Sequence, residues 1–271
     1  YLLAGDEFLY VPSGRSLPVA VSKKTGEIVF QRKYSWRSTA GGVVGGTKAL
    51  LGDGQVYAGG PHHFLALDQK TGDVGEAWIN GRQMVLAEDF AYLADGEKIF
   101  CVNRRAHAEA SQEKQKWFLK AREWRREPEK VAEATEKMKE YMRVGIHWEF
   151  PSDFDDALIA CENLIVAGGM NQIVALDRST GEQRWRYEVD GNVRGLAIDE
   201  GVLTVSTDSG KIYAFRSDEP SRKANEWSVA RTEAFPKDEL TELYRTAAEQ
   251  ILSQSGQTSG YCLVLGSEQG R

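Results

Sequence analysis

The feature that most constrains the fold of this chain is a sixteen-residue stretch that occurs twice. AGGPHHFLALDQKTGD, at residues 58–73, aligns without a gap with AGGMNQIVALDRSTGE, at residues 167–182. A third stretch, PSGRSLPVAVSKKTGE at residues 12–27, follows the same spacing more loosely. Self-similarity on this scale indicates a repeat architecture. Most of the distinctive residues are therefore expected to be structural.

Each repeat predicts short strands that are separated by two kinds of turn. In the copy around Asp177, the runs 163–167 and 172–176 are apolar and of strand length, and two glycines lie between them. The D-x-x-T-G turn at 177–181 follows. Its glycine suits a left-handed position, and its Asp and Thr side chains suit hydrogen bonds to the turn backbone. Residues 182–189 then resume as an alternating strand.

Two weaker copies, DGEKIFCV at 95–102 and DSGKIYAF at 208–215, bring the recognisable repeats to five. Small side chains occupy the equivalent position in all five, at Ala20, Ala66, Cys101, Ala175 and Ala214. The spacing is about 40 residues, apart from one interval nearly twice as long, and this is the length of a β-propeller blade. The sequence therefore predicts an all-β propeller of four-stranded blades over residues 1–218.

The motif A-L-D-x-x-T-G-[DE] resembles the pyrroloquinoline-quinone-like propeller repeat. In that family an aromatic residue follows the turn glycine by about four positions and packs between neighbouring blades. Phe30 and Trp185 have this spacing, and Trp78 comes two residues late. The family usually closes with seven or eight blades. Because the chain opens at Tyr1 within a strand-like run, we expect blades to be missing at the N-terminus, and a five-bladed ring is the alternative.

The resemblance also raises the question of quinone-dependent dehydrogenation. Dehydrogenases of the family hold the quinone with Ca²⁺ near the axis and commonly use a pair of adjacent cysteines. Cys101, Cys161 and Cys262 are scattered, and no calcium loop stands out. Asp153, Asp155 and Asp156 are interpreted as a solvated turn. We therefore expect no catalytic residue and no cofactor in this chain, and pyrroloquinoline quinone is disfavoured.

Composition excludes several other classes of function. A net charge of −6 argues against a general nucleic-acid surface, and no apolar run approaches the roughly 18 residues of a membrane span. The four histidines lack metal-ligand spacing, so we expect no metal site. Motifs for hydrolysis of esters or nucleoside triphosphates are also missing.

Between residues 107 and 143 the β pattern stops, and a segment rich in Glu, Lys and Ala predicts a helical hairpin inserted into a propeller turn. Trp117, Ala121 and Trp124 have helical spacing, and Pro128 suits the start of the second helix. Insertions on propeller turns often carry specificity. Trp117 and Trp124 are therefore candidate partner-binding residues, and the alternative is that the two helices pack on each other and on the propeller edge.

The C-terminal part departs from the repeat. Residues 219–259 predict a linker and a helix at 236–253, with Leu240, Tyr244 and Ile251 among its apolar residues. Residues 260–271 read as an apolar strand and a glycine loop, which together resemble the opening of a class I S-adenosylmethionine-dependent methyltransferase. The resemblance would place Gly266 and Gly270 in the cofactor-binding loop, although Glu268 occupies the position where the middle glycine is expected.

Three hypotheses follow for the function. The leading one is a non-catalytic propeller that binds a protein or small-molecule partner as a scaffold, as an appendage of a longer protein. The second is an accessory, substrate-binding part of a methyltransferase whose longer parent would bind S-adenosylmethionine. The third, a quinone-dependent dehydrogenase, is disfavoured. An exported or periplasmic location is what the family resemblance implies.

Overall fold

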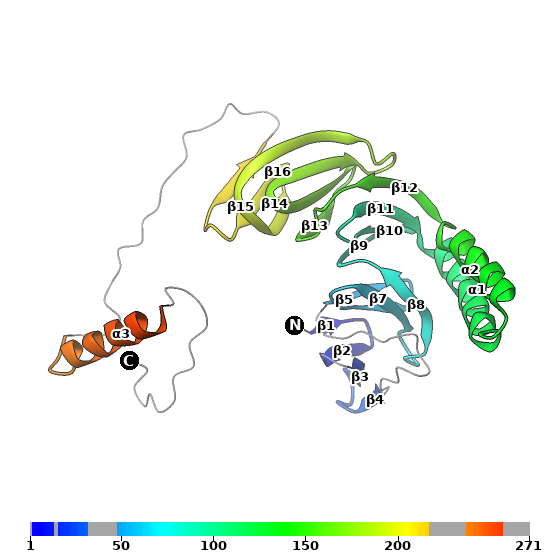
Figure 1. Cartoon of the computed structure of the whole chain (residues 1–271), viewed down its shortest axis with the longest axis horizontal. Coiled ribbons are helices and arrows are strands. Elements are labelled where there is room, and N and C mark those ends of the chain that lie inside the picture. Colours follow the sequence, from blue (N-terminus) through cyan, green and yellow to red (C-terminus); the bar gives the residue numbers. More distant parts are fainter. Residues whose placement is uncertain (1, 14–15, 32–47, 217–236, 257–271) are drawn as a thin grey trace. The chain divides into compact units, whose positions relative to one another are not determined.

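The computed structural model describes residues 2–13, 16–31, 48–216 and 237–256 (Figure 1). The chain divides into two compact units, Tyr1–Glu219 and Pro220–Arg271. All the described strands belong to the first unit, and the second contains one described helix.

Three antiparallel sheets of four strands open the first unit, and in each the strands neighbour one another in chain order. The first sheet contains β1 (Leu3–Ala4), β2 (Phe8–Ser13), β3 (Ser16–Ser22) and β4 (Ile28–Gln31). The second contains β5 (Lys48–Gly52), β6 (Gln55–Gly59), β7 (His63–Asp68) and β8 (Val74–Asn80). The third contains β9 (Gln83–Ala87), β10 (Phe90–Ala94), β11 (Lys98–Asn103) and β12 (Ile146–Pro151).

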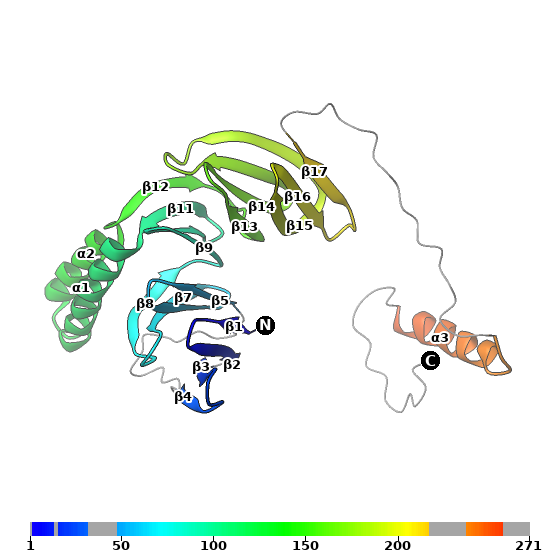
Figure 2. The same ribbon diagram turned by 180° about the vertical axis from the view of Figure 1, so that it is seen from behind.

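The last sheet comprises two blades that share a strand (Figure 2). Its strands are β13 (Ala157–Ala160), β14 (Leu164–Asp177), β15 (Gln183–Asp199), β16 (Val202–Thr207) and β17 (Ile212–Phe215). The amide of Arg178 donates to the carbonyl of Asn163, so β14 folds back on itself as a hairpin. The first part of β15 pairs with β14, and the part from Val193 onwards pairs with β16. Four complete blades are thus followed by three strands of a fifth, and the predicted propeller of four-stranded blades is confirmed.

An apolar core lies between each pair of consecutive blades. Tyr10, Leu65 and Leu67 belong to the core of blades one and two, and Phe64, Leu93 and Phe100 to that of blades two and three. The cores of blades three and four and of blades four and five are built in the same way. Burial of apolar area between sheets stabilises such an arrangement by roughly 25 cal/mol per Å². Each blade therefore depends on its neighbours for its stability.

The five small residues predicted to be equivalent all lie on the third strand of their blades. Three of them pair in register with a tyrosine on the second strand. The pairs are Ala20 with Tyr10, Ala66 with Tyr57, and Cys101 with Tyr92. A small residue opposite the large ring keeps the two strands' side chains from colliding.

The D-x-x-T-G turn has the predicted geometry. The Oδ1 atom of Asp68 accepts the amides of Lys70 and Thr71 at 2.9 and 2.8 Å. Asp177 does the same for Ser179 and Thr180. The turn glycines Gly72 and Gly181 have φ angles of 70° and 74°, which residues other than glycine adopt only with strain.

The turn glycine also receives an aromatic ring from the preceding blade. A Cβ atom on Gly72 would lie 2.5 Å from the ring of Phe30, as the family resemblance implies. A Cβ on Gly181 would lie 2.6 Å from the ring of Trp148, a residue that the sequence analysis did not select. Trp148 pairs with Cys101 as Phe30 pairs with Ala20, so it is the docking aromatic of the third blade.

The second blade departs from this rule. Glu76, not Trp78, pairs with Ala66 and holds the aromatic position. The next blade has no D-x-x-T-G turn to receive a ring, because the helical insertion replaces that turn. Glu76 is instead buried against the insertion, with its Oε1 2.5 Å from Nδ1 of His107.

The insertion is the predicted hairpin of α1 (Arg104–Glu123) and α2 (Pro128–Met142), placed between β11 and β12. It begins three residues before the expected boundary at 107, because Asn103 stands at the Asp position of the replaced turn. Its Oδ1 accepts the amide of Ala106 at 3.0 Å and caps α1. The amide of Asn103 donates to the carbonyl of Gly145 at 2.7 Å, which closes the base of the insertion.

The second unit contains α3 (Thr241–Ser255), which overlaps the helix predicted at 236–253 but begins five residues after its expected start. None of its residues is buried, and its exposed apolar side chains include Leu243, Tyr244 and Ile251. The strand and glycine loop proposed for a methyltransferase, with Gly266 and Gly270, lie outside the described residues. Among the described helices, none is long and apolar enough to cross a membrane.

Candidate binding face

A pocket and the helical hairpin, the two candidate functional features, lie at the same end of the blades. In blades two, three and four, the residue after the third strand donates its amide to the turn between the first two strands. These bonds run from Gln69 to Gly54, from Arg104 to Asp89 and from Arg178 to Asn163. The turns at this end form one face, which we call the turn face. The helical hairpin rises from it at the third blade.

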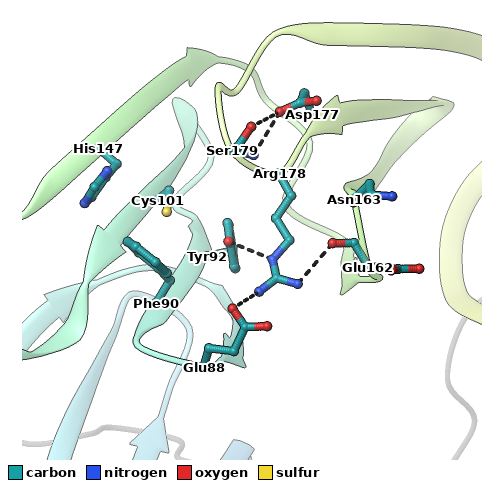
Figure 3. A pocket seen from close by; sticks show the side chains of 10 residues that line it. All are labelled: Glu88, Phe90, Tyr92, Cys101, His147, Glu162, Asn163, Asp177, Arg178 and Ser179. Carbon is teal, nitrogen blue, oxygen red and sulfur yellow. Dashed lines mark hydrogen bonds and ion pairs between the residues drawn. The ribbon is translucent and has the colours of Figure 1, made fainter.

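A pocket of about 500 Å³ lies on the turn face between the third and fourth blades (Figure 3). Phe90, Tyr92 and Cys101 form the wall from the third blade, and their neighbour His147 comes from β12. The rings of Phe90 and His147 meet edge to face, with their centroids 4.8 Å apart. The remaining lining residues come from turns: Glu88, Glu162, Asn163, Asp177, Arg178 and Ser179.

Arg178 is the centre of this pocket (Figure 3). Its Nε donates to the hydroxyl of Tyr92 at 3.0 Å, and its Nη1 donates to the carbonyl of Glu162 at 3.2 Å. Its Nη2 lies 2.8 Å from a carboxylate oxygen of Glu88. The arginine side chain is 16% exposed, whereas that of Glu88 is 75% exposed. The guanidinium is therefore fixed from three sides, while its carboxylate partner stands largely in water.

Three ionisable groups of the pocket have shifted pKa values. Burial raises the pKa of the Cys101 thiol to about 11, so the thiol is protonated at neutral pH. Burial also raises the pKa of Tyr92, although the hydrogen bond from Arg178 opposes the effect. Hydrogen bonds from Ser179 and Arg184 hold the pKa of Asp177 well below its ordinary value.

The same arrangement of residues recurs between the second and third blades. Arg104 follows the third strand there, pairs with Asp53 at 2.5 Å and lies next to Tyr57, while its buried Nε and Nη1 atoms have no hydrogen-bond partner among the described residues. Its side chain is only 10% exposed, and its Nη1 would lie 2.9 Å from a Cβ atom on Gly52. Arg104 therefore fills its own cleft, whereas Arg178 borders a hollow.

The hairpin carries the two tryptophans predicted to bind a partner. Trp117 lies on α1 and Trp124 caps its C-terminus, and both are partly exposed. Lys120 lies 4.0 Å above the ring of Trp117, and Lys130 lies 5.7 Å from that of Trp124. The two helices pack on each other, and α1 also contacts β8 and β11. Part of the hairpin surface is therefore used for packing, as the alternative interpretation expected.

Two further apolar side chains of α1, which follow Trp117 in the sequence, are exposed. Phe118 is 38% exposed and Leu119 is 52% exposed. The base of α1 is held by the pairing of His107 with Glu76, and burial lowers the pKa of Lys114 although Glu76 opposes this effect. A fixed base and an exposed apolar surface suit a binding element. The role of Trp117 and Trp124 in binding stays a prediction.

Two members of the acidic trio form ion pairs with arginines. Asp155 pairs with Arg82 at 2.6 Å, and Asp156 pairs with Arg194 at 3.3 Å. These ion pairs tie the third, fourth and fifth blades together. Both carboxylates lie in the irregular segment between β12 and β13, where a turn was expected, and each has an arginine partner there.

Sequence reasoning missed Arg178 and Tyr92. Both carried a signal, because Arg178 directly follows the motif residue Asp177 and a tyrosine recurs opposite the small residue in three blades. Their meeting depends on how the fourth blade packs against the third, which no single repeat encodes.

Comparisons with known proteins agree with the fold. A family model described as outer membrane protein assembly factor BamB matches residues 120–264, which is more than half of the chain. The match reaches the segment assigned to the methyltransferase resemblance and gives that resemblance no support. No curated protein sequence matches the chain.

Solved structures show the same likeness at low identity. BamB from Moraxella catarrhalis is 13% identical, with 82% of this chain and 70% of that chain covered and a TM-score of 0.46. The extracellular domain of a hybrid two-component system from B. thetaiotaomicron is 12% identical, with a TM-score of 0.56. That likeness covers 83% of this chain and 28% of the other, and it bears on the fold alone.

Proposed function

Because this chain belongs to the propeller family described as outer membrane protein assembly factor BamB, we propose that it is a non-catalytic module that binds and scaffolds a protein partner. The observation that carries the proposal is the helical hairpin, whose base is fixed on the turn face and whose apolar side chains are exposed. An exported location, as the family resemblance implies, is part of the proposal.

The hairpin has the mechanical properties that a binding element requires. The Asn103–Gly145 hydrogen bond closes its base, and the buried Glu76–His107 pair holds α1 against the second blade. Little conformational freedom at the base remains to be lost on binding. A preorganised surface binds more tightly than a loose one for the same contacts.

The outer part of α1 has the composition of an interface core with a charged rim. Trp117 and Trp124 supply large rings, and residues of this type dominate the binding energy of many interfaces. Phe118 and Leu119 add exposed apolar side chains to α1. Arginine at the rim sets orientation and partner choice more than affinity, and Arg122 is exposed next to this surface.

The experiment is a pull-down with the purified chain as bait and Trp117→Ala and Trp124→Ala as variants. Each variant should lower capture of the partner by about tenfold or more, which corresponds to loss of a strong interface residue. Tyr187→Ala, which removes a 51% exposed ring far along the chain on β15, is the matched control and should capture normally.

A second readout separates binding from a mere loss of structure. A photo-crosslinking residue at Leu119, which is 52% exposed, should trap the partner, and one at Ile212, 75% exposed on β17, should not. Normal capture by both tryptophan variants, with no crosslink at position 119, would refute the hairpin as the binding element.

A further inference from the structure

The pocket beside Arg178 offers hydrogen-bond donors that the fold does not use. A guanidinium carries five N–H groups. Three are engaged, by the hydroxyl of Tyr92, the carbonyl of Glu162 and the carboxylate of Glu88. The two that remain have no partner among the described residues, one on each terminal nitrogen.

The position of this guanidinium is fixed before any ligand arrives. Its three partners come from different places, since Tyr92 lies on β10, Glu88 in the turn before it, and Glu162 in the turn after β13. An arginine held by several directional bonds loses little side-chain entropy when it binds a further group. The pocket is thus preorganised around one cation.

We infer that this pocket binds a carboxylate, carried by a peptide segment that also has an aromatic or aliphatic side chain. Paired N–H groups of arginine match the two oxygens of a carboxylate. The ring of Phe90, which meets the ring of His147 edge to face, gives the pocket an aromatic lining. The volume of about 500 Å³ is within the range of small-ligand sites and suits one or two amino-acid residues.

The acidic residues around the pocket set its affinity. The charge of Asp177 is partly offset by its hydrogen bond from Ser179 and its pairing with Arg184, and Glu162 also lines the pocket. Glu88 already holds one edge of Arg178, yet its side chain is 75% exposed. Glu88 therefore acts as a weak internal competitor, because exposed ion pairs contribute little and exchange readily with water.

The equivalent site one blade earlier provides a matched control. Arg104, Asp53 and Tyr57 repeat the chemistry, but Arg104 is 10% exposed and lies against Gly52 where Arg178 borders a hollow. Removal of the Asp53 carboxylate should not open a path for a ligand to the Arg104 guanidinium. Only the site at Arg178 should respond to a ligand.

The test is fluorescence anisotropy with labelled peptides and the whole chain. The first peptide contains one phenylalanine followed by one glutamate and has both ends blocked, and the second has glutamine in place of glutamate. The third is the glutamine peptide with a free C-terminal carboxylate. The glutamate peptide or the free-carboxylate peptide should bind at least about tenfold more tightly than the blocked glutamine peptide. The tighter of the two identifies the source of the carboxylate.

Variants then assign the binding to Arg178. Arg178→Gln should lower affinity for the carboxylate peptide about tenfold, and Arg178→Lys should restore only part of it, because an ammonium lacks the planar fork. Glu88→Gln should raise affinity several-fold by removing the competitor. Asp53→Asn should leave it unchanged.

The inference does not depend on the hairpin, since no hairpin residue lines this pocket. It is overturned if blocked glutamate and glutamine peptides and the free-carboxylate peptide bind equally or not at all, or if Glu88→Gln weakens binding. The peptide comparison and the Glu88→Gln variant keep the test decisive even where Arg178→Gln disturbs the contact between blades. Loss of partner capture by the tryptophan variants with normal peptide binding would separate the two proposals.

Discussion

Replacement of Gly181 by alanine should destabilise the propeller more than the same replacement at Gly26. Both glycines end a T-G turn, and their φ values are 74° and 76°. An alanine at either position must adopt the left-handed conformation, at a cost of about 1–2 kcal/mol. The two positions differ in their surroundings, because nothing lies within 4 Å of a Cβ atom on Gly26.

The additional cost at Gly181 comes from the docked tryptophan. A Cβ atom there would lie 2.6 Å from two ring carbons of Trp148, which is 8% exposed and donates its Nε1 to the carbonyl of Arg178 at 3.0 Å. The ring is held by this bond and by its neighbours, so it cannot move aside freely. Overpacking of this kind typically costs about 1–3 kcal/mol. Gly181→Ala should therefore lower the free energy of unfolding by about 1–3 kcal/mol more than Gly26→Ala does.

Equilibrium unfolding in urea, followed by circular dichroism, measures both losses. A Trp148→Leu background provides the internal check, because a smaller side chain leaves room for the new methyl group. In that background the two alanine variants should differ by less than about 0.5 kcal/mol, since the coupling between the two sites is then removed. Equal losses at Gly181 and Gly26 in the natural background would refute the docking argument.

Two further predictions concern ionisable groups. The pKa of Asp177 lies below its ordinary value of 3.8 because Ser179 and Arg184 stabilise the carboxylate. A lowered pKa stabilises the fold above the unfolded value and loses that effect as the pH falls toward the folded value. Asp177→Asn should therefore lower the thermal midpoint of unfolding at pH 7. Below about pH 4 the midpoints of the variant and the natural chain should converge. Because burial raises the pKa of Cys101 to about 11, this thiol should resist alkylation in the native chain at pH 8, while the less buried Cys161 should react faster, as peptide mass spectrometry would show.

The architecture was predictable because each repeat carries its own strands and turns. The D-x-x-T-G motif fixes local hydrogen bonds, and the small residue on the third strand marks the register opposite a tyrosine. Such features lie within about 40 residues and are visible in a single copy. The helical hairpin was predictable for the same reason, since its apolar spacing is local.

The contacts between blades were not predictable in this way. Trp148 escaped notice because the hairpin separates it from Cys101, its register partner, so the usual spacing from turn to aromatic is lost. The pairing of Arg178 with Tyr92 joins residues 86 positions apart. The boundary of the hairpin was misplaced because Asn103 caps a helix where its counterparts close a turn.

The replacement of the docking aromatic by Glu76 has a practical consequence for engineering. The hairpin and its receptor on the second blade form one transferable unit, because the helix brings His107 to the place where another blade would offer a bare glycine. A graft of residues 104–144 onto a different blade would leave His107 facing an aromatic ring. Such a graft should dock properly only when the preceding blade also receives a glutamate opposite its small third-strand residue. Successful transplantation of this element therefore requires a change in two blades at once.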